Sequence, residues 1–255
     1  MIAKLGPSNI LHRHALYVLH HGIPTSCFSQ IREITSLYAL PDPLVTLSNP
    51  PPSKQVWKKR VKTAVCSHWH ATLVAQAAAL PSLCYLRPAF IPLGRGAHPV
   101  WSHCPPSSTA VRAATIQARM LSGRYRTDWL RRHWGAGETG VCRLPGCNHP
   151  QADLEHLLTG ACPAIAPTLA TTLHHWNNLL LHHPLLIPIV HAALLLPPAP
   201  FVTFLLDPST DPSVISLTQL YGTDLLTPLF RLSRMWVWAA HRQRLRLLGL
   251  HLFLL

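Results

Sequence analysis

A regular apolar stripe after residue 53 predicts an amphipathic helix. Every fourth residue there is large and apolar, at Trp57, Val61, Val65 and Trp69, and this spacing places the side chains on one helical face. The segment's lysines lie off that face, at Lys54, Lys58, Lys59 and Lys62. We expect the helix to end near residue 80, because proline follows at position 81. Packing into a core is the favoured role of the stripe, with base stacking as the alternative.

Three other segments have helical patterns. One covers residues 31–40. The second follows Ser107 and Ser108, whose hydroxyls can cap a helix N-terminus, and Gly123 can end it. Its apolar side consists of Val111, Ala114, Ala118 and Leu121. The third covers about residues 225–248, where arginines surround two tryptophans, and would suit a second phosphate-facing surface or a helix that binds a partner.

Composition supports a folded, basic protein. The 255 residues are 48% hydrophobic, which is enough to bury a core. Lysine and arginine number 22 against 9 acidic residues, a net charge of +13 with histidine neutral. Such a surplus attracts phosphate backbones and releases their counterions. RNA or DNA is therefore the leading partner, and a solvated basic surface is the alternative.

The densest positive feature is an arginine run of six residues within 21 positions. Its members are Arg112, Arg119, Arg124, Arg126, Arg131 and Arg132. The first two are seven residues apart, hence two turns along one helical face, and only Asp128 opposes the run. Arginine binds phosphate oxygens in a bidentate manner, so we expect these residues to bind nucleic acid. Possible stacking surfaces lie between them, at Tyr125, Trp129 and Trp134. Arginines that only solvate a helix are the alternative.

A second motif has the composition of a metal site. Its ligands, which we call the Cys3His cluster, are Cys142, Cys147, His156 and Cys162. Three thiolates and one imidazole are the donors that Zn²⁺ prefers, and four protein ligands leave no open position, so we expect a structural zinc ion. The first pair can turn around Pro145 and Gly146, and His156 would lie on a short helix. His149 is a competing ligand, and ordinary buried thiols with a helical histidine are the alternative to a zinc site.

No catalytic centre is expected. Polymerases and nucleases need clustered carboxylates to hold paired Mg²⁺ ions, and no two acidic residues of this chain are adjacent. The segment from Tyr221 to Asp224 matches half of a Tyr-x-Asp-Asp turn, but Leu225 replaces the second aspartate. Phosphate-binding Gly-rich loops and Gly-x-Ser-x-Gly elbows are also missing from the sequence.

Residues 179–206 are apolar enough to suggest a basic membrane-associated protein as the alternative function. Five prolines interrupt that segment, which would leave backbone groups unsatisfied in lipid, so a membrane partner is not favoured. The N-terminus has no cleavable signal pattern, and the cysteine count of seven is odd. We therefore expect a reducing compartment, nuclear or cytoplasmic, and no secretion.

These features together predict a mainly α fold. The 25 prolines break helix interiors, so we expect short helices around a small zinc module, joined by Pro-rich, poorly ordered loops. Four segments follow from the patterns. They are an N-terminal segment and linker (1–52), an amphipathic helix and loop (53–98), an Arg-rich helix with the zinc module (99–170) and an apolar, Pro-interrupted helical tail (171–255).

Five short segments follow one another in a characteristic order. They are Trp57…Trp69, Ser82-Leu83-x-Tyr85-Leu86, His98-Pro99-Val100-Trp101, VRAATIQARMLSGRYRT at 111–127, and Cys142…Cys147…His156-Leu157-Leu158…Cys162. This order resembles the region downstream of the polymerase in non-LTR retrotransposon proteins. There an Arg-rich helix ending in Leu-x-Gly-x-Tyr precedes a Cys/Cys/His/Cys zinc motif. The resemblance covers about residues 53–170.

The resemblance implies zinc at the Cys3His cluster and a role in holding template RNA or target DNA for target-primed reverse transcription. In an intact element an upstream polymerase domain would be a partner. The chain departs from that pattern in its wider first cysteine pair, in the missing polymerase and endonuclease domains, and in residues 171–255, which match no part of it. It therefore resembles a truncated or decayed reading frame.

Overall fold

The computed structural model describes residues 5–49, 52–87, 97–133, 135 and 139–250. Within these ranges the regular structure is entirely helical, which confirms the predicted mainly α fold. The chain forms two compact units, residues 1–73 and 74–255, and the long helix α4 (Lys54–Ala79) contributes to both. Trp134 and parts of two Pro-rich stretches, at 50–51 and 88–96, lie outside the described residues.

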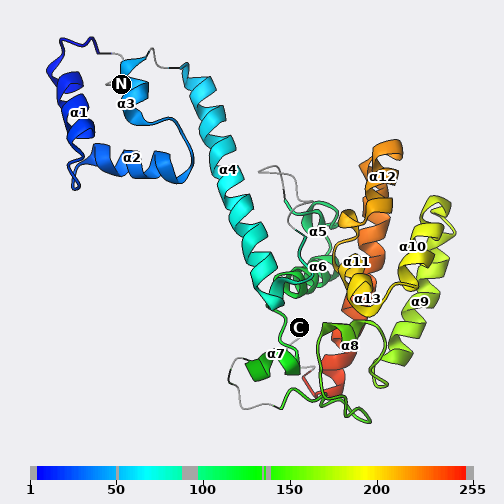
Figure 1. The fold of residues 1–255 in the computed structure, drawn as a ribbon. Helices are drawn as coiled ribbons and strands as arrows, with labels where there is room; N and C mark the ends of the chain where they lie inside the picture. The colour runs from blue at the N-terminus through cyan, green and yellow to red at the C-terminus, as the bar shows by residue number, and fades with distance from the viewer. Residues whose placement is uncertain (1–4, 50–51, 88–96, 134, 136–138, 251–255) are drawn as a thin grey trace. The chain divides into compact units, whose positions relative to one another are not determined.

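The first unit packs three short helices against one another and includes the first part of α4 (Figure 1). These are α1 (Ile10–His21), α2 (Cys27–Leu37) and α3 (Pro43–Ser48). Thus α2 begins before the predicted segment 31–40, because the Ser26 hydroxyl caps it by accepting a hydrogen bond from the backbone N–H of Ser29. The Pro-rich stretch 41–52 contains α3, because proline is compatible with the first turn of a helix and Asp42 caps it.

The predicted helix from residue 53 forms α4, but the prediction that its aromatic stripe packs into a core is wrong. No residue of α4 is buried, and Trp69 is 58% exposed. A four-residue spacing shows that side chains share a face. It does not show that another element covers that face.

The second unit contains the remaining helices (Figure 1). In chain order they are η2 (Pro81–Leu83), α5 (Pro99–Ser102), α6 (Ser108–Leu121), α7 (Asp128–His133), α8 (Leu154–Leu158), α9 (Ala166–Leu180), η4 (Pro184–Leu186), α10 (Ile187–Leu194), α11 (Pro198–Leu206), η5 (Pro208–Thr210), α12 (Pro212–Tyr221), η6 (Thr223–Leu225) and α13 (Leu226–Leu247).

Helix α13, predicted at about 225–248, organises this unit because it packs against α6, α8, α9 and α11. Its Trp236 is buried, and the indole N–H donates a hydrogen bond to the carbonyl oxygen of Leu158 at 2.8 Å. The buried Trp176 of α9 donates in the same way to Leu232 on α13 at 3.0 Å. Satisfying both indole donors allows the two rings to pack at a centroid distance of 4.8 Å in an otherwise apolar core.

Helix α6 begins as predicted, with the Ser107 hydroxyl accepting a hydrogen bond from the N–H of Ala110. Its buried face differs from the predicted one, since Val111 is 44% exposed and Gln117 is fully buried. The Gln117 side-chain amide donates to the carbonyl oxygens of Leu205 and Leu206 at the end of α11, at 3.3 and 2.8 Å. An apolar pattern misses such a residue because its side-chain N–H groups are satisfied by backbone carbonyls of a distant helix.

The apolar segment 179–206 is divided among α9, η4, α10 and α11, with breaks at prolines. Many of its side chains belong to the core of the second unit, among them Leu186, Val190 and Phe204. In the described part of the chain, no helix has both the length and the apolar character that crossing a membrane requires.

Candidate metal centre and arginine cavity

The Cys3His cluster is assembled from a tight turn, a one-turn helix and a cysteine in the short loop after that helix. Cys142 and Cys147 flank the turn, where Gly146 has φ 71° and the N–H of Cys147 donates to the carbonyl of Leu144 at 3.0 Å. His156 lies on α8, which Asp153 caps by accepting from the N–H of His156 at 2.8 Å. The N–H of Cys162 then donates to the carbonyl of His156 at 3.2 Å. The turn and the helix therefore form as the sequence predicts.

The four donor atoms have the separations that one metal ion requires. All lie within 4.8 Å of one another, and all four residues are buried. The Sγ atoms of Cys142 and Cys162 are 3.9 Å apart, and Sγ of Cys147 is 3.2 Å from Nε2 of His156. A tetrahedral ion with metal–sulfur bonds of about 2.3 Å would separate two sulfurs by roughly 3.8 Å. The cysteines are free thiols. The cluster can therefore hold a metal ion.

Electrostatics also fit a cation at this point. Burial raises the pKa of Cys142 to about 12 and also raises the pKa of Cys162. Buried thiols thus stay protonated near neutral pH unless a cation stabilises the thiolates. Burial, followed by the neighbouring His149, lowers the pKa of His156, which keeps the imidazole in the neutral form that coordinates metals.

His149, a competing ligand by sequence, lies outside this donor set. Its ring stacks on that of His156, with centroids 4.3 Å apart and planes inclined by 13°. Its Nδ1 contacts the backbone of Gln151 at 2.8 Å. The stacked ring covers His156, whose Nδ1 is buried and has no hydrogen-bond partner among the described residues. In the same residues, no other group of three or more His, Cys, Asp or Glu side chains is placed to hold a metal.

Beside the metal module lies an arginine cavity of about 890 Å³. It is lined by six arginines, namely Arg119, Arg124, Arg126, Arg131, Arg143 and Arg244, and by no described carboxylate. Four of these belong to the predicted arginine run. The other two lie outside that run. Arg143 lies between the first two metal ligands and was not predicted, and Arg244 lies on α13, which was predicted as a separate phosphate-facing surface or a partner-binding helix. The sequence feature that could have identified Arg143 is its position between two metal ligands.

The two remaining members of the predicted run do not line this cavity. Arg112 is exposed on α6. The guanidinium of Arg132 lies 5.5 Å from the ring centre of Trp129 and donates to the carbonyl of Thr139 at 3.5 Å. The proposed stacking role of Tyr125 is also wrong, because that ring is only 7% exposed. The aromatic side chain that reaches the cavity from solvent is Trp101, which is 40% exposed.

One buried carboxylate fixes the geometry of the cavity. Asp128 accepts hydrogen bonds from Arg143 at 2.8 Å and from Arg244 at 3.3 Å, and its side chain is only 3% exposed. It therefore joins the metal module to α13 and partly compensates two guanidinium charges. Arg119, Arg124 and Arg126 are exposed and form no ion pair with the described residues.

Burial and the neighbouring positive charges both lower the pKa of a histidine that also lines the cavity. The pKa of His241 is lowered to about 4, first by burial and then by the charges of Arg244 and Arg119. His241 is therefore neutral near pH 7, and its Nδ1 lies 3.1 Å from the hydroxyl of Tyr125. The smaller part of this shift, which comes from the two guanidinium groups, reflects a local positive potential that attracts anions.

Comparison with family models, with curated proteins and with solved structures finds no match to the chain.

Proposed function

We propose that the chain is a zinc-stabilised protein that binds RNA or DNA through the arginine cavity and has no catalytic centre of its own. The observation that carries the proposal is the convergence of six arginines from α6, the following loop, α7, the metal module and α13 on one cavity. Asp128 compensates Arg143 and Arg244, but Arg119, Arg124 and Arg126 form no ion pair with the described residues, and like charges repel. A polyanion that contacts several guanidinium groups would offset the repulsion.

Zinc is the metal we assign to the Cys3His cluster. Three thiolates and an imidazole favour it over hard cations, and four buried protein donors match a structural site. The ion would hold the turn at Cys142–Cys147 against α8. Because Arg143 belongs to that turn and pairs with Asp128, zinc would position one wall of the arginine cavity.

We further propose kinship with the tail of non-LTR retrotransposon proteins, supported by the order of the motifs. One residue of that pattern has a clear structural reason. Gly123, in the Leu-x-Gly-x-Tyr segment, has φ 65°, and a Cβ there would lie 2.3 Å from the carbonyl oxygen of Ser82. Ser82 itself belongs to the Ser-Leu-x-Tyr-Leu segment, so two of the motifs depend on each other in space. In an intact element a polymerase domain would be the natural partner.

The test of this function reverses two cavity charges in the full chain. We expect Arg119→Glu with Arg126→Glu to weaken both RNA and DNA binding and to reduce the salt dependence of the affinity. The reduction should be roughly 0.7–0.9 log units per tenfold salt for each lost phosphate contact. Zinc content should remain one ion per chain, because neither residue contacts the cluster. Fluorescence anisotropy over a salt series and elemental analysis are the measurements.

The matched control is Arg13→Glu with Arg231→Glu, which changes the net charge equally at two exposed arginines outside the cavity. Binding by the control should stay close to that of the parent. Equal affinities for the parent and the cavity variant at moderate salt would show that the arginines are only a solvated surface.

A further inference from the structure

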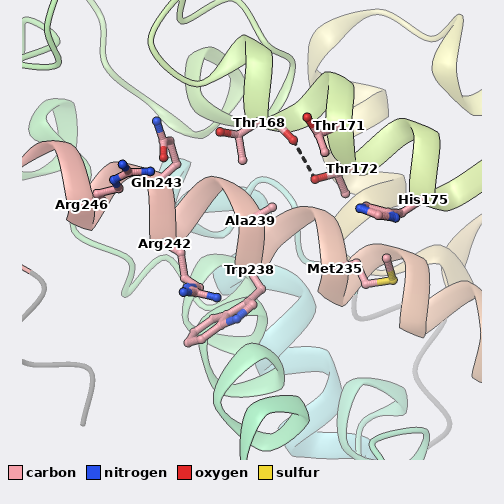
Figure 2. A pocket seen from close by; sticks show the side chains of 10 residues that line it. All are labelled: Thr168, Thr171, Thr172, His175, Met235, Trp238, Ala239, Arg242, Gln243 and Arg246. Atoms are coloured by element: carbon pink, nitrogen blue, oxygen red, sulfur yellow. Dashed lines mark hydrogen bonds between the residues drawn. The ribbon is translucent and has the colours of Figure 1, made fainter.

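A second cleft, of about 600 Å³, lies between α9 and α13 (Figure 2). Its α13 wall carries Trp238, Arg242 and Arg246. Its α9 wall carries Thr168, Thr171 and His175. Figure 2 shows the Trp238 ring beside the Arg242 side chain, one helical turn further along α13.

The positive charges of this cleft have no partner among the described residues. The side chains of Arg242 and Arg246 are exposed, and their guanidinium groups form no ion pair or hydrogen bond there. No described carboxylate lines the cleft. Two guanidinium groups one turn apart, next to an aromatic ring that is partly exposed, offer donors for phosphate and a face for a base.

The cleft and the arginine cavity meet along α13. His241 and Leu245 line the cavity, and Trp238 and Arg242 line the cleft on the adjoining face of the same helix. The rings of Trp238 and His241 are 5.7 Å apart, which places the tryptophan on the ridge between the two sites. A ligand that occupies both must therefore bend around the helix.

We propose that this ligand is a single strand of nucleic acid that runs from the arginine cavity over Trp238 into the α9–α13 cleft, with one unpaired base stacked on the indole. The inference rests on the proposed function and specifies its substrate class. A duplex is stiff over roughly 150 base pairs and keeps its bases paired and stacked. It cannot both turn around one helix, which is about 10 Å wide, and offer a free base face.

The test compares a single strand of about 12 nucleotides with a blunt duplex of the same sequence, both binding to the full chain. Trp238→Ala should weaken single-strand binding about five- to tenfold, the low end of the range for one stacked base, because Trp238 is only partly exposed. Duplex affinity should not change. Trp238→Phe should restore most of the loss, since phenylalanine keeps a stacking face. The fluorescence of an aminopurine base in the strand should fall when the parent binds, and it should fall less when the Trp238→Ala variant binds.

The matched control is Tyr17→Ala, which removes an exposed aromatic side chain from α1 and should leave both affinities unchanged. Because Trp238 also packs against the core, a second variant avoids the core entirely. Arg242→Glu with Arg246→Glu should lower single-strand affinity and its salt dependence, and leave duplex affinity near that of the parent.

The outcomes separate this inference from the proposed function. If the Arg119/Arg126 reversal abolishes binding while the Trp238 and Arg242/Arg246 variants bind the single strand like the parent, the path over α13 is wrong and the cavity alone binds. Equal losses for strand and duplex in those variants would also overturn the path. If the Arg119/Arg126 reversal has no effect, the proposed function itself fails.

Discussion

At the scale of single residues, the Cys3His cluster brings four buried donor side chains together. Its thiols are buried with raised pKa values, and the Nδ1 atom of His156 has no hydrogen-bond partner among the described residues. Such a cluster gains little without an ion, because its donor atoms then have only weak sulfur hydrogen bonds with one another. Metal binding and folding of the 140–165 segment should therefore be coupled.

We predict that Cys147→Ser abolishes stoichiometric zinc binding and unfolds residues 140–165, because a hydroxyl is a poor substitute for a thiolate ligand. Elemental analysis should give about one zinc per chain for the parent in reducing buffer and none for the variant, as expected for one complete ligand set. Amide hydrogen exchange should lose protection across the segment. Cys84→Ser, at an exposed cysteine outside the cluster, is the control. A zinc-free parent would contradict the prediction.

At the scale of secondary-structure elements, the end of α6 is tied to η2 by a close backbone approach. Gly123 follows α6 with φ 65°, where a side chain is strained, and its Cα lies against the backbone of Ser82. The end of α6 and η2 are thus held together by a contact that only glycine permits. Movement at this point would shift Arg124 and Arg126, which follow directly.

We expect Gly123→Ala to destabilise the second unit by more than the conformational penalty of about 1 kcal/mol for a left-handed residue. The excess arises because the new Cβ would lie 2.3 Å from a backbone oxygen that has to move. Gly249→Ala is the reference, since Gly249 has φ 70° and open space around its Cβ position. Denaturant unfolding of both variants gives the comparison, and equal losses would show that the contact with Ser82 is easily relaxed.

At the scale of the whole molecule, the described aspartates lie apart from one another, and several have separate structural roles. Asp128 joins two arginines, Asp207 lies 3.3 Å from His98, and Asp42, Asp153 and Asp211 cap helices. Catalysis with paired Mg²⁺ ions requires carboxylates that converge on one point. The positive charge, in contrast, gathers on neighbouring surfaces of the second unit.

We therefore predict that the purified chain neither extends a primer nor cleaves DNA or RNA in the presence of Mg²⁺, although it binds nucleic acid. Primer extension and cleavage assays at saturating substrate are the measurements, with binding verified in the same buffer. The isosteric variant Asp224→Asn tests the exposed aspartate of the Tyr-x-x-Asp segment. Magnesium-dependent activity that survives this substitution would contradict the prediction and show that the chain has a catalytic centre elsewhere.

The sequence by itself determined the features that depend on local chemistry. The helical class, the start of α6 at Ser107, the turn at Gly146 and the one-turn helix carrying His156 follow from caps, glycine and spacing. The four donors of the Cys3His cluster lie within 21 residues. Short loops leave such ligands few alternative arrangements, so their order in the chain was sufficient.

Only the tertiary structure decided which residues share a surface. Arg143 and Arg244 join the arginine cavity because Asp128 draws both of them together across the core. The α4 stripe, by contrast, has no buried residue, and Gln117 is buried because α11 supplies its acceptors. Each of these outcomes depends on whether a segment distant in sequence packs there. Periodicity shows only which face a residue occupies on its own helix.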